Sequence, residues 1–449
     1  MGRLFGTDGA RGIANTELTC ELAMQIGRAA AVVLTKHTNH KPKILIGKDT
    51  RVSSEMLEAA LTAGLCSVGA DAELVGVIPT PAIAYLVPKY EADAGIMISA
   101  SHNPVEFNGI KLFSRTGYKL PDPVEEEIEG LILDHPEKIA LKKGIELGRV
   151  YKRKSAVSDY VEHIKRTVDI DLSGINVAVD CANGSASSTA DLLFRELGAS
   201  AHIIHANPNG MNINDKCGST NLDALVYYMK EHGCEVGVAF DGDADRCLAV
   251  DENGNRVDGD QIIAIFAINM KAEGRLASDT AVVTVMSNFG MQQFGRDNGI
   301  NVVSTAVGDR YVLEEMLKND YNLGGEDSGH IILKDFANTG DGQLTAVQLL
   351  RIYKMQGVKM SELAKAMTKS PQVTKCVPAD AQARANFLKD AEIVRVIDEV
   401  KAELGDKGRV LVRASGTEPL IRVMIEGSEY AVINECCDRI CDIVKERIA

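Results

Sequence analysis

The sequence lacks the long hydrophobic segment that a membrane protein needs. In its 449 residues we find no run of about eighteen apolar side chains, so no membrane span is expected. The opening MGRLFGTDGARG has no basic segment followed by an apolar run, which indicates that no signal peptide is present. The 10 cysteines lack framework spacing, and Cys436, Cys437 and Cys441 fit one face of a packed helix. These absences favour a cytoplasmic protein with reduced thiols.

Basic residues are scarce relative to acidic ones. Lys and Arg number 49 against 63 Asp and Glu, which gives a net charge of −14. Such a surface repels nucleic acid and anionic lipid, so we expect neither as a partner. An anionic substrate must then be held by local Arg, Lys and backbone N–H groups. A globular composition over 449 residues requires more than one hydrophobic core, so several domains are expected.

Short apolar strand patterns alternate with helical patterns along most of the chain. This order predicts an α/β fold with mixed, largely parallel sheets. It recurs three times and ends at the strands 94–99 and 234–240 and at the polar segment 324–330. We therefore expect three related α/β domains, each presenting one polar loop at a strand end. Their expected bounds are 1–153, 154–254 and 255–369.

The last part of the sequence has a different pattern. Pro371 and Pro378 lie in an irregular stretch that we interpret as a linker. A helix at 391–404, two strands at 409–413 and 420–425 with a polar loop between them, and a closing helix from Ser428 are expected to follow. This pattern predicts a smaller α+β domain over 370–449. Together the four domains would surround a central cleft.

The loop 100–104 (ASHNP) contains a serine suited to carry a phosphoryl group. The Ser101 hydroxyl could form a covalent intermediate and so divide one difficult displacement into two easier ones. His102 is its neighbour, and Lys111 could supply positive charge for the transferring group. An ordinary serine turn is the alternative, and it is the commoner use of an isolated serine.

A second loop alternates acidic residues after a strand. Asp241, Asp243 and Asp245 would project to one side and converge on a hard cation. An EF-hand is disfavoured because Arg246 stands where that loop needs glycine. A phosphatase with an aspartyl nucleophile remains open, and so does a solvated acidic turn.

Two further loops and one arginine carry polar groups. GGEDSGH, residues 324–330, suits recognition of sugar hydroxyls and proton transfer. RASGTEP, residues 413–419, and the nearby Arg422 are typical of an anion nest. Arg11 in FGTDGARG is another candidate phosphate contact. The alternative for GGEDSGH is an ordinary turn, for RASGTEP a hairpin turn, and for Arg11 a surface charge.

Five motifs in order, FGTDGARG, ISASHNP, DGDADR, GGEDSGH and RASGTEP, resemble the phosphohexose mutase superfamily over the whole chain. FGTDG, VGDRYVLEEM and NTGDGQLTA resemble its glucosamine-phosphate branch. That resemblance implies interconversion of glucosamine 6-phosphate and glucosamine 1-phosphate through a phosphoserine enzyme and a 1,6-bisphosphate, feeding UDP-N-acetylglucosamine and cell-wall precursor synthesis. The alternatives are a mutase for mannose or glucose phosphates, a metal-dependent phosphatase using Asp241, and a non-catalytic sugar-phosphate binding protein.

The resemblance also implies roles for individual residues. Ser101 must be phosphorylated for activity, and one Mg²⁺ would be held by Ser101 and the three aspartates. The catalytic group would be Ser101, His102, Lys111, Arg11 and His330, and the substrate-binding group Arg246, Glu326, Ser328, Arg413, Ser415, Gly416, Thr417 and Arg422. The partners would be a hexosamine phosphate, its bisphosphate and, as a homodimer, a second copy of the chain. Asp327 and Ala414 depart from the usual pattern of the branch, and Asp327 bears on sugar preference.

Overall fold

The computed structural model describes residues 2–6, 8–415 and 418–448. The chain divides into two compact units. The larger unit contains Met1–Met286 and Asn301–Ala366, and the smaller contains Ser287–Ile300 and Met367–Ala449. Within the described ranges, no helix combines the length and the apolar character that crossing a membrane requires.

The first sheet of the larger unit has six strands in the order β1-β5-β4-β2-β3-β6. Strands β2, β3, β4 and β6 run parallel, whereas β5 is antiparallel to both β4 and β1. Their bounds are β1 Ala10–Ile13, β2 Lys43–Lys48, β3 Asp71–Val77, β4 Ala94–Ile98, β5 Phe107–Ser114 and β6 Val150–Lys152.

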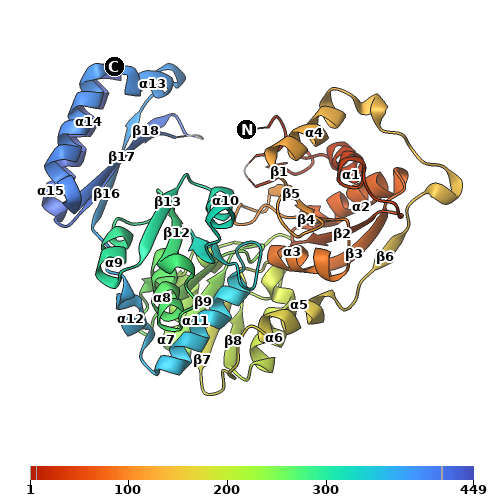
Figure 1. Ribbon diagram of the computed structural model, residues 1–449, viewed down its shortest axis with the longest axis horizontal. Coiled ribbons are helices and arrows are strands. Elements are labelled where there is room, and N and C mark those ends of the chain that lie inside the picture. Colours follow the sequence, from red (N-terminus) through yellow and green to blue (C-terminus); the bar gives the residue numbers. More distant parts are fainter. Residues whose placement is uncertain (1, 7, 416–417, 449) are drawn as a thin grey trace. The chain divides into compact units, whose positions relative to one another are not determined.

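Helices cover both faces of this first sheet (Figure 1). Ile44, Ile46 and Ile96 pack on one face with the helices α1 (Cys20–Leu34), α2 (Val52–Ser67) and α4 (Asp122–Leu133). On the other face Gly47 and Gly95 leave room for the helix α3 (Thr80–Lys89), because a Cβ at either position would meet its Ile83. Burial on both faces explains why these strands are almost continuously apolar.

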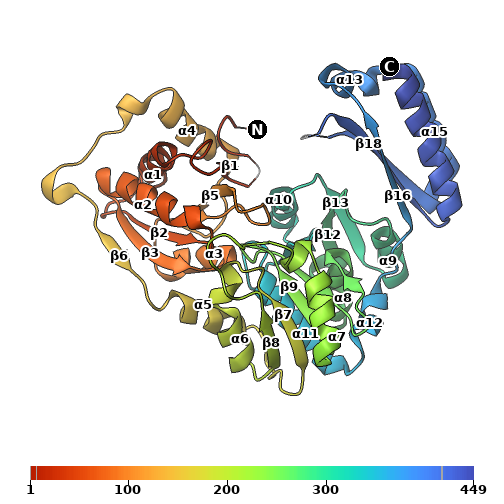
Figure 2. The same cartoon turned by 180° about the vertical axis from the view of Figure 1, so that it is seen from behind.

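The second and third sheets repeat this parallel arrangement. The second has the order β11-β10-β9-β7-β8, in which β9, β7 and β8 run parallel, and the third has the order β13-β12-β14-β15, in which β13, β12 and β14 run parallel. The helix α7 (Asp223–His232) packs on β7 and β9 (Figure 2). The strand bounds are β7 Asn176–Asp180, β8 Ser200–Ile204, β9 Val236–Phe240, β10 Cys247–Val250, β11 Arg256–Val257, β12 Thr280–Thr284, β13 Asn301–Thr305, β14 Leu323–Gly325 and β15 Ile331–Leu333. The other helices of this unit are α5 Ala156–Lys165, α6 Ala190–Glu196, α8 Gly259–Ala272, α10 Asp309–Asn319, α11 Gly342–Gln356 and α12 Met360–Leu363.

Each polar loop predicted in this unit joins a parallel strand to an antiparallel one. The serine loop (residues 99–106) joins β4 to β5, the aspartate loop (241–246) joins β9 to β10, and the glutamate loop (326–330) joins β14 to β15. All three loops are therefore hairpin connections held at both ends by a strand ladder. The sequence predicted the strands before the serine loop and the aspartate loop, and the structure adds β5 after the first and both β14 and β15 around the glutamate loop.

The smaller unit is built on an antiparallel sheet, β16-β18-β17. The helices α14 (Ala391–Leu404) and α15 (Tyr430–Ile448) lie side by side along one face of it (Figure 1). Cys436, Cys437 and Cys441 are buried in its core, which confirms the predicted helix face. The strands are β16 Gln372–Pro378, β17 Gly408–Ala414 and β18 Leu420–Gly427, and the remaining helices are α9 Gly290–Asn298 and α13 Ala381–Asn386.

The interpretation of Pro371–Pro378 as a linker is wrong. Residues Gln372–Pro378 form β16, which pairs with β18 along its whole length. Because β16 is an edge strand, its terminal Pro378 needs no ladder N–H, and Val373 and Val377 alternate into the core. The predicted fold class, mixed and largely parallel sheets with a smaller α+β part, is confirmed. The predicted bounds of the four domains stay predictions.

Candidate active site

Ser101 is buried in the serine loop and faces the aspartate loop. Its hydroxyl donates a hydrogen bond of 2.5 Å to Asp241 Oδ2, although 140 residues separate the two. The backbone of Ser101 has φ 51°, a left-handed conformation that few non-glycine residues adopt. Its N–H donates to Ser99 Oγ at 3.0 Å, which helps to hold this turn. The structure thus places the predicted phosphate carrier against the predicted cation site.

The three aspartates of the aspartate loop converge as predicted. Asp241, Asp243 and Asp245 are buried, and one carboxylate oxygen of each lies within 4.8 Å of the others. In the described part of the chain, Asp243 Oδ1 and Asp245 Oδ1 are buried and have no hydrogen-bond partner. Burying an unpaired carboxylate oxygen is costly, and oxygen donors of this kind are the ligands that Mg²⁺ prefers. The residues therefore fit a hard divalent cation.

The charges of this cluster depend on one another. Burial, together with the charges of Asp245 and Asp243, raises the pKa of Asp241 well above its usual range. Lys111 Nζ lies 2.8 Å from Asp243 Oδ2, 3.0 Å from Asp8 Oδ2 and 3.6 Å from Asp245 Oδ2. Burial alone would lower the pKa of Lys111, but Asp243 and Asp8 outweigh it and raise that pKa. Lys111 therefore stays protonated beside the aspartate loop.

His102 connects Ser101 to Arg246. Its Nδ1 lies 3.3 Å from Ser101 Oγ and 3.2 Å from Arg246 Nη1. Burial and the Arg246 charge lower the pKa of His102 to about 4, so the ring is neutral near neutral pH. The backbone N–H of Arg246 donates to Asp241 Oδ1 at 3.3 Å. Arg11 forms an ion pair with Asp8 and lies close enough to His102 for its charge to act on that ring.

The glutamate loop meets the aspartate loop through His330. Its Nδ1 lies 3.6 Å from Asp245 Oδ2, and Gly340 donates its N–H to Nε2 at 3.1 Å, which fixes the proton of the neutral ring on Nδ1. Ser328 Oγ lies 3.5 Å from Glu326 Oε2. Burial raises the pKa of Glu326. A raised pKa suits a carboxyl group that exchanges protons with a substrate.

Asp8, Lys119 and Asp309 complete this site and were not predicted. Lys119 Nζ lies 2.7 Å from Asp8 Oδ1 and 2.6 Å from Asp309 Oδ2, and Asp309 Oδ2 lies 3.4 Å from His330 Nε2. Acidic and basic or imidazole groups thus alternate in a closed ring made by Lys111, Asp8, Lys119, Asp309, His330 and Asp245. Asp309 lies within VGDRYVLEEM, but neither it nor Lys119 has a spacing that signals this role in a single sequence.

The residues predicted for an anion site belong to the smaller unit. Arg413 on β17 and Arg422 on β18 are directly paired across the two strands. Like charges in such a pair repel each other, so a bound anion would stabilise them. Ser415 Oγ accepts the N–H of Glu418 at 3.2 Å, and Arg384, which the sequence did not predict, donates to Ser415 O at 2.9 Å. The candidates Gly416 and Thr417 lie outside the described residues.

Comparison with protein-family models matches four consecutive parts of this chain. All four are described as phosphoglucomutase/phosphomannomutase: alpha/beta/alpha domain I over residues 2–138, domain II over 158–254, domain III over 258–370 and the C-terminal domain over 358–443. A phosphoglucosamine mutase of Acetivibrio thermocellus is 53% identical over 448 residues and is covered over 100% of both chains. One of Clostridium novyi is also 53% identical, over 100% of this chain and 99% of its own.

Solved structures share the fold at lower identity. A phosphoglucomutase/phosphomannomutase family protein from Burkholderia thailandensis superposes with a TM-score of 0.81 at 24% identity, over 99% of this chain and 98% of its own. N-acetylphosphoglucosamine mutase of Aspergillus fumigatus, solved in complex with GlcNAc-6P and magnesium, gives a TM-score of 0.68 at 17% identity, over 99% of this chain and 96% of its own.

Proposed function

Because the chain belongs to the phosphoglucomutase/phosphomannomutase family, we propose that it interconverts glucosamine 6-phosphate and glucosamine 1-phosphate through phosphorylated Ser101. The observation that carries this proposal is the hydrogen bond from the buried Ser101 hydroxyl to Asp241, within a cluster of three carboxylates. The amino sugar is proposed because full-length relatives at 53% identity are phosphoglucosamine mutases. The product would supply UDP-N-acetylglucosamine and cell-wall precursor synthesis.

Asp241, Asp243 and Asp245, with the phosphate on Ser101, would hold one Mg²⁺. The two orphaned oxygens of Asp243 and Asp245 support this assignment. A bound divalent cation supplies positive charge that offsets the negative charge on the transferring phosphoryl group. Lys111 adds a fixed positive charge beside it, and Arg246 and Arg11 face the same region through His102.

The first transfer moves the phosphoryl group from the enzyme to the sugar. The bond between phosphorus and Ser101 Oγ breaks, and a bond forms between phosphorus and O1 of glucosamine 6-phosphate. The hydroxyl proton of O1 passes to the glutamate loop, where Glu326 has the raised pKa that suits an acceptor and His330 lies nearby. The oxygen left on Ser101 faces Asp241, and Lys111 supplies positive charge to the same aspartate loop through Asp243.

The second transfer runs the same chemistry in reverse from the other end of the sugar. Glucosamine 1,6-bisphosphate turns, its 6-phosphoryl group returns to Ser101, and the proton held by the glutamate loop goes to the O6 leaving group. Glu326 and Ser328 would hold the sugar hydroxyls in both orientations. The phosphate that does not react would be held by Arg413, Ser415, Gly416, Thr417 and Arg422. The pairing of the two arginine charges across β17 and β18 supports this.

The wider setting is also a proposal. All ten cysteines are free, which is compatible with the reducing cytoplasm that we propose as the location. We propose a homodimer without a nucleic acid or membrane partner, in keeping with the net charge of −14.

Interconversion assays with glucosamine, glucose and mannose phosphates test the proposed function. We expect the glucosamine phosphates to be turned over at least about tenfold more efficiently, a difference that needs only about 1.4 kcal/mol. Equal turnover of glucose or mannose phosphates would support the second candidate, and Asp327, which departs from the pattern of the glucosamine branch next to Glu326, is the residue that bears on this preference.

Ser101→Ala should lose turnover in the same assay while its circular dichroism spectrum stays that of wild type. Normal mutase activity in this variant would refute the covalent route. Release of free phosphate that is indifferent to Ser101 would instead favour a phosphatase that uses Asp241 as nucleophile.

A further inference from the structure

The main chain of the serine loop is held by an arginine from another segment. Arg51, whose side chain is fully buried, donates through Nη2 to Ser101 O at 3.0 Å and to Asn103 O at 2.7 Å. Its Nη1 donates to Pro104 O at 2.5 Å. Its Nε donates to Asp49 Oδ2 at 2.9 Å, so the buried guanidinium also has a paired charge. One rigid planar group therefore contacts three carbonyls of the loop that carries Ser101.

Asn214 holds two of the same carbonyls from another side. Its Nδ2 donates to Ser101 O at 2.9 Å and to Asn103 O at 3.2 Å. A carbonyl oxygen has two lone pairs, so Arg51 and Asn214 together fill those of both oxygens. Because both hydrogens of the Asn214 amide are used, the orientation of its side chain is fixed. The loop cannot rotate either peptide without breaking two hydrogen bonds.

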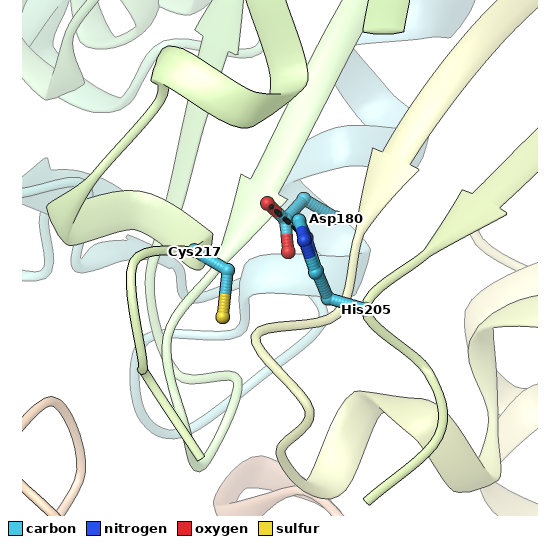
Figure 3. A group of neighbouring side chains, drawn as sticks. All are labelled: Asp180, His205 and Cys217. Carbon is cyan, nitrogen blue, oxygen red and sulfur yellow. Dashed lines mark ion pairs between the residues drawn. The ribbon is translucent and has the colours of Figure 1, made fainter. Parts of the chain in front are cut away.

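The segment that carries Asn214 is itself anchored at both ends by Asp180 (Figure 3). Asp180 Oδ2 lies 3.0 Å from His205 Nδ1 and accepts the N–H of Gly218 at 3.0 Å. Asp180 Oδ1 accepts the N–H of Ala182 at 2.9 Å. Cys217 lies beside this pair, but both carboxylate oxygens are already satisfied without an ion. The group fixes the ends of the segment 206–217, with Asn214 between them.

The same contacts connect the serine loop to the aspartate loop. A Cβ on Gly242 would lie 2.5 Å from Ser101 O and 2.9 Å from Asn214 Nδ2, so only glycine permits this approach. Gly242 O in turn accepts the N–H of Ser185 at 2.8 Å. Since φ 51° at Ser101 is unfavourable by itself, the surrounding contacts must maintain it.

We propose that Arg51 and Asn214 are positioning residues for phosphoryl transfer. They hold the main chain of the serine loop so that Ser101 Oγ faces the aspartate loop in both transfers. Neither residue needs to touch the sugar, and both act through the carbonyls of Ser101 and Asn103. This inference rests on the proposed function, because it assumes that the Ser101 oxygen gives and takes the phosphoryl group. A misplacement of about 1 Å can lower a transfer rate about 100-fold.

Asn214→Asp is the decisive variant. It keeps the size of the side chain but replaces the donor with an oxygen that repels the two carbonyls. We expect kcat for glucosamine 6-phosphate to fall about 10- to 100-fold, with KM changed less than about threefold, because the sugar contacts stay intact. Asn209→Asp is the matched control, since Asn209 is exposed in the same segment and its side chain accepts only the N–H of Met211.

The result that overturns the inference is a kcat for Asn214→Asp equal to that of Asn209→Asp. A lowered melting temperature with unchanged kcat would also overturn it, because it would show a purely structural role. If Asn214→Asp does not fold, Asn214→Gly provides the test, since glycine keeps the φ of 58° and removes the amide. Wild type that fails to interconvert glucosamine phosphates would refute the proposed function instead, so the two failures are distinguishable.

Arg51→Lys tests the second positioning residue. Lysine keeps a positive charge beside Asp49 but cannot reach three carbonyls with a planar fork, so kcat should again fall more than KM rises. Arg28→Lys is the control, because Arg28 donates to Ser67 Oγ and lies outside the site. Equal kcat values for Arg51→Lys and Arg28→Lys would remove Arg51 from the proposal.

Discussion

Asp341 gives a prediction whose size and sign follow from the structure. Asp341 is buried, its side chain caps the N-terminus of α11 by accepting the N–H of Leu344 at 2.9 Å, and the Tyr160 hydroxyl lies 2.8 Å from both of its oxygens. Burial nevertheless raises the pKa of Asp341 to about 6. The ionised form is therefore less stable in the folded protein than in the unfolded chain.

This pKa shift converts into a pH-dependent penalty. A rise from 3.8 to about 6 corresponds to about 3 kcal/mol of stability, since each unit is worth about 1.4 kcal/mol. The penalty is absent below the unfolded value, grows between the two values and is complete above about pH 6. Near pH 4.5 it amounts to about 1 kcal/mol by the same linkage relation. Asp341→Asn cannot titrate, so relative to wild type it should gain about 2 kcal/mol between about pH 4.5 and 7.5.

Urea unfolding of wild type and Asp341→Asn at about pH 4.5 and 7.5 measures this change. The sequence has no tryptophan, so far-ultraviolet circular dichroism is the suitable signal. Any pH-independent cost of the new amide cancels when the two pH values are compared. This cost should also be small, because asparagine is a good N-cap as well. Asp341→Ala, which loses the cap as well as the charge, should show the same pH dependence with an added constant loss of about 1 kcal/mol. An offset between wild type and Asp341→Asn that is the same at both pH values would refute the reasoning.

Three further predictions concern other groups of the molecule. Asp243→Asn should weaken activity and shift its magnesium titration to higher concentration together; an unchanged titration would contradict the metal assignment. Arg413→Ala should raise KM about tenfold with a smaller effect on kcat, because a grip on the distal phosphate acts in ground and transition states alike; a fall in kcat at constant KM would argue against it. The neighbouring Asp180 carboxylate raises the pKa of His205, so its stabilising contribution is complete below the unfolded pKa and is lost as pH rises through the folded one. The difference in unfolding midpoint between wild type and His205→Gln should therefore be larger at about pH 5 and shrink as the pH rises; a constant difference would contradict this.

Periodic segments were predicted well because local pattern decides them. The predicted helix 391–404 agrees with α14 residue for residue. Short strands beside the polar loops, such as β15, were missed because they pair only with a partner brought there by the turn. The strand β16 was missed because two prolines indicate a loop unless the strand is known to lie at an edge.

Some residues of the candidate site could be predicted from the sequence, and others could not. The alternating aspartates and Ser101 could be found because a repeated residue type after a strand is visible in one sequence. The resemblance identified the family, which the relatives confirm. Asp8, Lys119 and Asp309 could not be found, because the contacts of Lys119 with Asp8 and Asp309 span 111 and 190 residues and no spacing records such contacts. Arg51 and Asn214 left only a weak signal: polar residues just after the strand β2 and in an asparagine-rich loop.

The left-handed backbone at Ser101 restricts which hydroxyl amino acid fits at the proposed phosphate carrier. Threonine offers the same nucleophilic oxygen, yet its branched Cβ is poorly tolerated at a φ of 51°. Placing it there would cost about 1–3 kcal/mol or force the peptide to turn away from Asp241. The nucleophilicity of the hydroxyl therefore does not decide between serine and threonine at this position. The backbone conformation disfavours threonine, although its hydroxyl could do the same chemistry.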